Sequence, residues 1–263
     1  MSLVSIIIPS YKDPYLYRTV ESMLVGATGD IEIIPVLDGY WAEQIHTDSR
    51  VKYLHLGKNR GMRGAINAGV SVAKGDYIMR SDEHCLYAKG FDVELSSVCD
   101  ENVIVTPRRY FLNPEKWERM DLPYWDYERL EIRDDVKFEG RHWRQRERER
   151  GHVSVDETMS MQGSCWMMQR SWWDRVIGEL DDEHYGPLIQ DSHEMVFKTW
   201  QAGGKLLVNK RTWFAHKHVA FPRTHNQGTT ENPARCDEGY AYALKTWKPY
   251  YEEVIRPRWF GSA

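Results

Sequence analysis

The sequence predicts an α/β fold with a mostly parallel central sheet flanked by helices. Short β-branched runs alternate with stretches of helical spacing through the first 80 residues, and turn residues follow each run. This alternation is typical of parallel sheets whose connecting helices cover both faces. With 263 residues, the chain is long enough for one large domain with a substantial core.

The first strand–helix–strand unit is predicted at residues 3–8, 15–25 and 31–37. The apolar run at 3–8 is ended by Pro9, and the segment 15–25 carries apolar residues at helical spacing. The run at 31–37 stops at an Asp-Gly turn that begins with Asp38. We therefore expect a strand, a helix and a second parallel strand.

A third strand at 51–56, a helix at 61–74 and a fourth strand at 77–79 continue the alternation. The helix is rich in small residues, which allows close packing on a sheet, and Gly75 can end it. Ligands of such sheets bind beyond the carboxyl ends of the strands. The polar or turn residues expected to gather at that edge are Pro9, Tyr11, Asp38 and Asn59.

The composition narrows the functional class. A formal net charge of -4 argues against a surface built for nonspecific binding of polyanions. The four cysteines have no paired short spacing, so we expect neither a zinc site nor a disulfide framework, and a cytoplasmic location fits. The N-terminal apolar run is too short for a membrane span and lacks the basic region of a signal peptide.

Residues 113–160 depart from the α/β pattern. Charged and aromatic residues replace the alternation, and an Arg-rich stretch at 141–150 alternates Glu with Arg. One interpretation is a solvated helix face or a disordered loop with balanced charges; the other is an acceptor-binding lid that carries Trp143. Regular structure is predicted to return with a strand at 161–168 and a helix at 171–177.

A polar cluster, Asp82-Glu83-His84, follows the fourth strand. Side chains at i and i+2 on an extended segment share a face, so Asp82 and His84 can point at one ion. An oxygen and an imidazole ligand together favour a borderline metal such as Mn²⁺ over Mg²⁺, which stays possible. We expect Glu83, between them, to point away from the metal.

A set of motifs surrounds this cluster. They are Val-Ser-Ile-Ile-Ile-Pro-Ser-Tyr at 4–11, Asp-Gly at 38–39, Asn-Arg-Gly at 59–61, Asn-Ala-Gly at 67–69 and Ala-Lys-Gly-Asp-Tyr-Ile at 73–78. The set resembles the GT-A glycosyltransferases, particularly family 2 enzymes and the polypeptide N-acetylgalactosaminyltransferases. In those enzymes the last stretch leads into an Asp-x-Asp metal motif. The resemblance implies the GT-A fold and places Asp82 and His84 at the two ligand positions.

The resemblance continues after the central segment. The polypeptide N-acetylgalactosaminyltransferases carry Asp-x-His followed by Cys at the metal motif, as this chain does at 82–85. Their later segments resemble Gln162-Gly163-Ser164, residues 191–194, residues 200–204 and Phe214-Ala215-His216. By that resemblance His216 is the third metal ligand, and Gly163 lies in a loop beside the donor.

The resemblance implies a metal-dependent hexosyl- or N-acetylhexosaminyltransferase that moves a sugar from a nucleotide-diphosphate donor, a UDP-sugar first, to a hydroxyl acceptor. A divalent cation neutralises the charge that builds on the leaving diphosphate. Asp38 would hydrogen-bond the base, although simple turn chemistry also explains it. The remaining donor residues are Pro9 and Tyr11 at the base and ribose, Arg63 and Asn67 near the diphosphate or uracil, and Asp82 through the metal.

Asp191 is the candidate catalytic residue. It stands just before a predicted helix, where an Asp often serves as N-cap. In inverting family 2 enzymes the matching acidic residue is the base that takes the acceptor hydroxyl proton. If the enzyme retains configuration, Asp191 would instead orient donor or acceptor hydroxyls, and the sequence leaves both open.

The motifs cover residues 3–86 and 161–218. We therefore expect a catalytic domain at 1–220, with 113–160 as a variable acceptor excursion. Residues 221–263 would form a C-terminal extension packed on or covering the active site.

Two other functional classes use the same residues or fold. Asp82, His84 and His216 have the composition of the facial triad of non-haem iron oxygenases, but those enzymes use an antiparallel barrel and another ligand order. A noncatalytic GT-A-like binding module is the second alternative. For the acceptor, a glycan or small molecule ranks ahead of nucleic acid such as a modified DNA base, because acceptor loops vary within this fold.

Overall fold

Strand β1 (Val4–Ser10) lies in the middle of the central sheet, between β2 (Ile31–Asp38) and β4 (Tyr77–Ser81), and is parallel to both. The computed structural model describes residues 2–186, 190–218 and 234–261. Within β1, Ile6 and Ile8 belong to one hydrophobic core and Ile7 to the other. The run is apolar without interruption because both faces of the sheet are covered.

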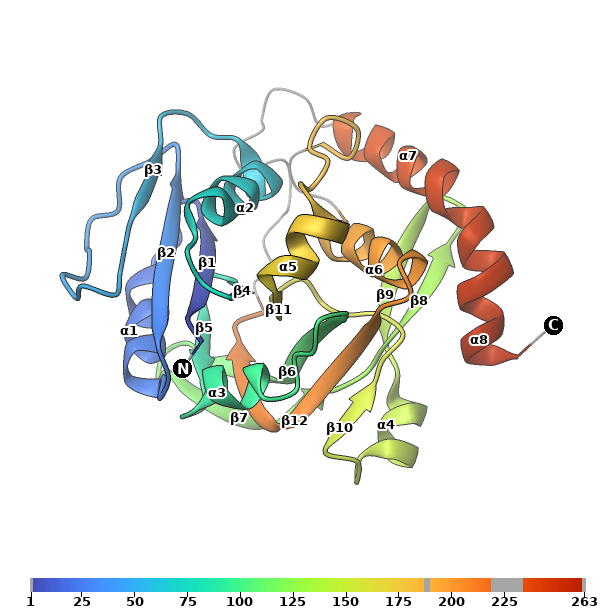
Figure 1. Ribbon diagram of the computed structural model, residues 1–263, viewed down its shortest axis with the longest axis horizontal. Helices are drawn as coiled ribbons and strands as arrows, with labels where there is room; N and C mark the ends of the chain where they lie inside the picture. Colours follow the sequence, from blue (N-terminus) through green and yellow to red (C-terminus); the bar gives the residue numbers. More distant parts are fainter. Residues whose placement is uncertain (1, 187–189, 219–233, 262–263) are drawn as a thin grey trace.

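The main path of the sheet has the order β10-β12-β6-β11-β4-β1-β2-β3 (Figure 1). The strands on it that have not yet been given are β3 (Leu54–Leu56), β6 (Val103–Asn113), β10 (Val155–Glu157), β11 (Cys165–Gln169) and β12 (Lys205–His216). All run in one direction except β10 and β11. Off this path, β5 (Cys85–Tyr87) pairs with β12 and β7 (Glu118–Trp125) pairs with β6. The predicted mostly parallel sheet is confirmed.

Helices cover both faces of the sheet, as predicted (Figure 1). On one face lie α1 (Leu16–Gly26) and α3 (Phe91–Ser96). The helices of the other face are α2 (Gly61–Val72), α5 (Arg170–Trp172) with η1 (Trp173–Ile177), and α6 (Asp191–Gln201). The predicted helices at 15–25 and 61–74 are confirmed to within two residues at each end, whereas the strand predicted at 51–56 is regular only over β3.

The central segment forms regular elements, so the interpretation of it as a disordered loop is wrong, whereas the solvated helix face is found in its Arg-rich part. After β7 it forms a hairpin of β8 (Glu128–Arg133) and β9 (Lys137–His142), then α4 (Arg144–Arg150) and β10. Leu130 and Phe138 of the hairpin are almost fully buried, and Arg150 of the Arg-rich stretch pairs with Asp156 at 2.7 Å. A few buried apolar anchors thus hold a segment whose outer face is charged. Its proposed acceptor role stays a prediction.

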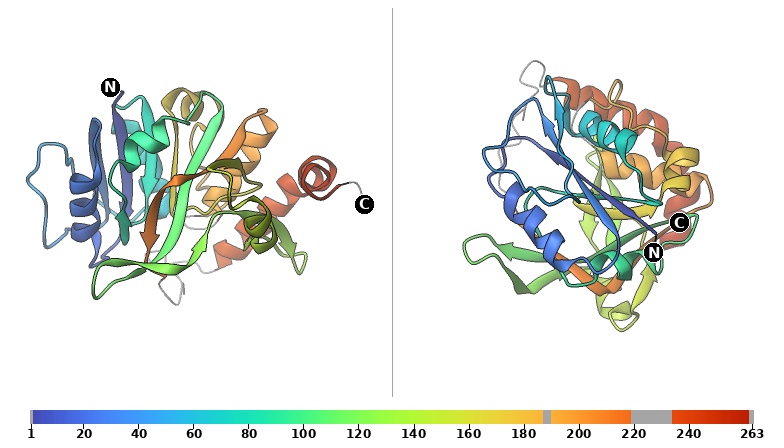
Figure 2. Two further views of the ribbon diagram at one scale, coloured as in Figure 1. Left: turned by 90° about the horizontal axis from the view of Figure 1, so that it is seen from below. Right: turned by 60° about the vertical axis from the view of Figure 1, so that its left-hand side comes forward.

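The C-terminal helices α7 (Ala234–Tyr250), η2 (Tyr251–Ile255) and α8 (Arg256–Phe260) lie at the end of the molecule opposite α1 (Figures 1 and 2). The Trp247 ring stacks on Phe197 of α6, with centroids 5.1 Å apart, and the Tyr251 hydroxyl donates to the Leu130 carbonyl of β8 at 2.8 Å. Residues 221–233 of the predicted extension lie outside the described residues, so its covering of the active site stays a prediction. Across the described residues, no helix has the length and apolar character needed to cross a membrane.

Close packing of α2 on the sheet depends on Gly69, and we predict that Gly69→Ala destabilises the fold. A Cβ at this position would lie 2.5 Å from Ile7 Cγ2 and 3.0 Å from Val36 Cγ2. The destabilisation from overpacking exceeds the stabilisation from the higher helix propensity of Ala. We therefore expect the unfolding free energy, measured by urea denaturation, to fall by about 1–2 kcal/mol. Ser71→Ala, on the exposed side of α2, is the control. Equal stability of the two variants would contradict the packing argument.

Candidate active site

Two distant segments meet at the carboxyl end of β4. Asp82 and His84 follow β4, and β5 then pairs with β12 in antiparallel register, with His216 opposite Cys85. The Lys217 backbone N–H donates to the His84 carbonyl at 3.1 Å and extends this ladder. The pairing therefore places His216 beside His84, although 132 residues separate them in the sequence.

The three predicted metal ligands converge. His216 Nε2 lies 2.9 Å from Asp82 Oδ2 and 3.1 Å from His84 Nε2, and one ligand atom from each residue falls within 4.8 Å of the others. Neighbouring ligands of an octahedral ion, each about 2.1 Å from it, are about 3.0 Å apart. The donor set and its spacing therefore fit a divalent cation.

Charge at the cluster is set by a buried arginine. Arg80 Nη2 donates to Asp82 Oδ1 at 2.6 Å, and Arg80 is 2% exposed. Burial alone would raise the pKa of Asp82, but the Arg80 guanidinium and the hydrogen bond with His216 hold it well below its usual range. Burial lowers the pKa of His216 to about 3. At neutral pH the cluster thus offers a carboxylate and a neutral imidazole, which are the forms that bind metals.

Asp13 supports the cluster from behind. Its Oδ2 lies 3.0 Å from His84 Nδ1, and its Oδ1 accepts from the Tyr15 backbone N–H at 2.7 Å. A carboxylate behind a ligating imidazole fixes the ring orientation and makes it a better ligand. Neither Asp13 nor Arg80 was predicted from the sequence. Both could have been found by their position, since Asp13 follows β1 at the same sheet edge and Arg80, on β4, precedes Asp82 by two residues.

Glu83 points away from the three ligands, as predicted. Its carboxylate accepts from the Tyr11 backbone N–H at 3.1 Å, and it is not part of the ligand cluster. The pKa of Glu83 is raised well above its usual value, mainly by burial and secondly by the nearby Asp13 carboxylate. The residue ties the turn after β1 to the metal motif.

The predicted nucleotide residues Pro9, Tyr11 and Asp38 lie at the ends of β1 and β2, beside the cluster. Pro9 is opposite Val36 in the parallel ladder. The Asp38 carboxylate accepts from the backbone N–H groups of Arg60 at 2.7 Å and Gly61 at 2.8 Å, at the start of α2. Burial raises its pKa. Turn chemistry therefore accounts for Asp38 in this structure, and its contact with a base stays a prediction.

Arg63 and Asn67 make their contacts with α6 and the segment that precedes it, and their predicted placement near the diphosphate or uracil stays a prediction. The Arg63 side chain is fully buried in an ion pair with Glu194, and its guanidinium lies 4.3 Å from the Tyr185 ring centroid. The Asn67 amide exchanges two hydrogen bonds of 2.9 Å with the Leu180 backbone. Both residues join α2 to the segment that leads into α6.

Asp191 and Gly163 lie together next to Arg80. Helix α6 begins at Asp191, but Gln190 occupies the N-cap position, and neither makes a side-chain capping bond. The N-cap interpretation of Asp191 is therefore wrong. Asp191 Oδ2 is buried without a hydrogen-bond partner among the described residues. A Cβ at Gly163 would lie 3.0 Å from that oxygen and 3.5 Å from Arg80 Nη1, so glycine lets the loop approach the carboxylate.

A mostly parallel α/β sheet with an Asp-x-His motif at a strand end and a histidine from a distant strand defines a GT-A type of protein. The chain belongs to glycosyl transferase family 2, because a model of that family matches residues 5–177. Curated relatives include the uncharacterized glycosyltransferase EpsJ of Bacillus subtilis (strain 168), 36% identical over 84 residues, and the glycosyltransferase GlyG of Streptococcus pneumoniae serotype 4 (strain ATCC BAA-334 / TIGR4), 38% identical over 84 residues. These matches cover 29% of this chain and 24% and 28% of the two relatives.

A solved structure supports the fold. The crystal structure of GalNAc-T7 with UDP, GalNAc and Mn²⁺ matches 97% of this chain and 50% of that protein, with a TM-score of 0.75 and 18% sequence identity. The likeness confirms the predicted GT-A fold.

Asp13→Asn tests the support behind His84. The amide can still accept from Tyr15, but its NH₂ group cannot accept from His84 Nδ1–H. We expect the affinity for Mn²⁺, measured by calorimetry in the presence of UDP, to fall about 10- to 100-fold. Asp121→Asn, at a side chain that is 89% exposed, is the matched control. Unchanged affinity in Asp13→Asn would show that His84 needs no such support.

Proposed function

We propose that this protein is a metal-dependent glycosyltransferase that moves a sugar from a nucleotide-diphosphate donor to a hydroxyl acceptor. The observation that carries the proposal is the convergence of Asp82, His84 and His216 at the carboxyl ends of the parallel strands. Ligands of open α/β sheets bind at this edge. Membership of glycosyl transferase family 2 supports the reaction class.

The metal proposed is Mn²⁺, with Mg²⁺ as the alternative. One carboxylate oxygen and two imidazole nitrogens suit a borderline ion better than a strictly oxygen-loving one. With the imidazoles neutral, the charges of Arg80, Asp82 and Asp13 leave about one net negative charge at the cluster, which favours a cation. When bound, the ion would neutralise charge on the leaving diphosphate.

The donor proposed is a UDP-sugar, with a hexose or N-acetylhexosamine as the transferred group. Pro9, Tyr11 and Asp38, at the carboxyl ends of β1 and β2, would contact the base and ribose. The structure of GalNAc-T7, whose title names UDP, GalNAc and Mn²⁺, has the same fold. Gly163 and Asp82 would face the donor sugar and diphosphate.

Asp191 is proposed as the residue that takes the proton of the acceptor hydroxyl. A general base must be within hydrogen-bond reach of that proton, and Asp191 Oδ2 is a buried oxygen without a partner among the described residues. It lies beside Arg80, the residue that also holds Asp82. Asp191 is therefore near the metal ligands while keeping one oxygen available.

The acceptor proposed is a glycan or a small molecule, ahead of a modified DNA base, and we propose that the protein acts in the cytoplasm.

A mostly parallel sheet argues against the iron oxygenase that would use the same three ligands. A noncatalytic binding module would bind the donor without turnover, so turnover separates it from an enzyme.

A donor and metal screen tests the proposed function. We expect calorimetry to show binding of UDP-glucose, UDP-galactose or UDP-N-acetylglucosamine only with Mn²⁺ or a similar ion, and slow donor hydrolysis without acceptor. His84→Ala and His216→Ala should each weaken donor binding at least tenfold, because each removes one metal ligand.

His152→Ala, at an exposed position, is the control for the histidine variants. Absence of binding to every donor, or unchanged binding and turnover in both ligand variants, would refute the proposed function. Turnover of 2-oxoglutarate with Fe²⁺ in the same assay would support the oxygenase instead.

Asp191→Asn separates catalysis from donor binding. The substitution keeps size and hydrogen bonding but removes the basic oxygen, so we expect kcat for transfer to fall by about 10²–10⁴. The Kd for the donor should change less than threefold. A kcat equal to that of the unmodified protein would exclude Asp191 as the base. Asp182→Asn provides the same chemical change at a nearby residue.

A further inference from the structure

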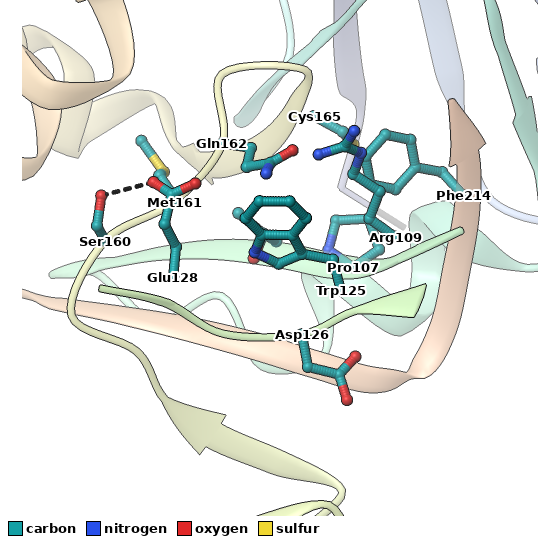
Figure 3. Close-up of a pocket in the computed structure, with 11 residues that line it drawn as sticks. Pro107, Arg109, Trp125, Asp126, Glu128, Ser160, Met161, Gln162, Cys165 and Phe214 are labelled. Atoms are coloured by element: carbon teal, nitrogen blue, oxygen red, sulfur yellow. Dashed lines mark hydrogen bonds between the residues drawn. The ribbon is translucent and has the colours of Figure 1, made fainter. Parts of the chain in front are cut away.

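A small pocket lies beside the strands that lead to the metal ligands. Its walls come from β6, the start of β8, Trp125 at the end of β7 and the loop 160–162 that precedes β11 (Figure 3). The free space is about 310 Å³ including the open mouth, but only about 20 Å³ of it can hold the centre of a water-sized group. The inner part therefore has room for one hydroxyl group, not for a whole sugar ring.

Two N–H groups of residues that line the pocket have no hydrogen-bond partner among the described residues, although Arg109 also pairs through Nη2 with His218. Arg109 is 6% exposed, and its Nε has no hydrogen-bond partner among the described residues; the same is true of Trp125 Nε1. The Glu128 carboxyl, 5% exposed, accepts from the Ser160 hydroxyl at 2.9 Å. Figure 3 shows Arg109, Gln162 and Glu128 around the Trp125 ring. Two unused N–H donors and a carboxyl group thus share a small buried space.

The Glu128 carboxyl is held in place by its surroundings. A Cβ at Gly140 of β9 would overlap the carboxyl group, so glycine leaves the room that it occupies. Asp126, two residues earlier, points away from the pocket and pairs with Arg108 at 2.6 Å (Figure 3). Of these two carboxyl groups, Glu128 is therefore the one that faces the pocket.

The pocket adjoins the candidate active site. Two of its lining residues lie close to the ligand-bearing segments: Cys165 of β11 is opposite Ser81, next to Asp82 in the sequence, and Phe214 precedes His216 on β12 by two residues. A third, Gln162, is next to Gly163, where a Cβ would lie 3.0 Å from the Asp191 carboxylate. The pocket is thus lined by sequence neighbours of the metal ligands and of the loop that packs near the candidate base.

We propose that this pocket binds a hydroxyl group of a carbohydrate acceptor, and that Glu128 anchors it. The inference rests on the proposed function and adds to it the chemical class of the acceptor and the place where it binds. The acceptor sugar lies across the mouth of the pocket and inserts one hydroxyl between Glu128 and the N–H groups of Arg109 and Trp125.

The position in the sheet favours the acceptor over the donor. The nucleotide residues lie on β1 and β2, and the pocket lies on β6, β7 and β8, with β4 and β11 between them. A donor that extends from the β1–β2 edge reaches the metal ligands first. The pocket strand β6 lies between β4, which leads to Asp82 and His84, and β12, which carries His216, so the pocket is on the side of β4 away from β1 and β2, where the second substrate would approach.

The chemistry of the pocket favours a neutral hydroxyl over an anion. The charges of Arg109 and Glu128 offset each other, so neither a phosphate nor a carboxylate gains from both. Burial raises the pKa of Glu128 to about 7, while the Ser160 hydroxyl and the Arg109 charge oppose the rise. A hydroxyl group both donates and accepts, so it can donate to the Glu128 carboxylate, in a charge-assisted hydrogen bond, and accept from Trp125 or Arg109.

The test compares acceptor binding with donor binding in the full chain. Saturation-transfer NMR measures binding of glucose, galactose, N-acetylglucosamine and glucuronic acid with Mn²⁺ and UDP present, and calorimetry measures the Kd of the UDP-sugar. Glu128→Gln keeps the acceptor oxygen for Ser160 but removes the charge. We expect at least a tenfold weaker affinity for the bound sugar and a donor Kd and donor hydrolysis rate within twofold.

Trp125→Phe is the second variant, because it keeps a ring and removes only the Nε1–H donor. We expect it to weaken sugar binding about threefold to tenfold, and it decides the question if Glu128→Gln does not fold. The matched controls are Glu131→Gln on the same strand, with its carboxyl 39% exposed, and Trp41→Phe, 74% exposed. Both should leave sugar and donor binding unchanged.

Three results would overturn the proposal. They are unchanged sugar affinity in folded Glu128→Gln, a parallel loss of donor affinity, which would make this a donor subsite, and no binding of any of the four sugars to the unmodified protein. Failure of the proposed function looks different, because there the unmodified protein binds no UDP-sugar with any metal. The sugar-binding measurement requires no turnover and is read independently of it.

Discussion

The antiparallel ladder between β5 and β12 is the constraint on which the candidate active site depends. It places His216 opposite Cys85, and neighbouring residues in a strand point to opposite faces. A slip of one residue would turn the His216 side chain away from Asp82 and His84. Buried contacts hold the register: Phe214 and Cys85 are at most 1% exposed, and Phe214 stacks on Tyr87 with centroids 6.0 Å apart.

Electrostatic interactions then keep Asp82 and His216 in the protonation states that bind a metal. Arg80 occupies one oxygen of Asp82 and leaves the other for His216 and a metal. The buried guanidinium keeps the carboxylate ionised, and burial keeps His216 neutral. The cluster is thus arranged without an ion, because Arg80 and His216 lie on strands and only the short turn 82–84 joins β4 to β5. Such preorganisation reduces the free-energy cost of ordering ligands when an ion binds.

Local patterns predicted the parts of this protein that local forces determine. The apolar run of β1 and the turn residues after each strand predicted the parallel sheet. The spacing of Asp82 and His84 predicted that their side chains share a face. His216 followed only from family resemblance, since no spacing reveals a partner 132 residues away. The buried ion pair of Arg63 with Glu194 and the hairpin at 128–142 were missed for the same reason. Few buried residues hold that hairpin, and its many charges obscured them.

Family membership and chemistry rest on different parts of the chain. The family match covers residues 5–177, which contain the sheet edge, Asp82 and His84. Asp191 and His216 lie beyond it, and so does the whole of β12. A chain with the matched segment alone would have two metal ligands and no candidate base. Catalysis as proposed therefore depends on β12 and α6, which bring the third ligand and a buried carboxylate to the sheet edge formed by the first half of the chain.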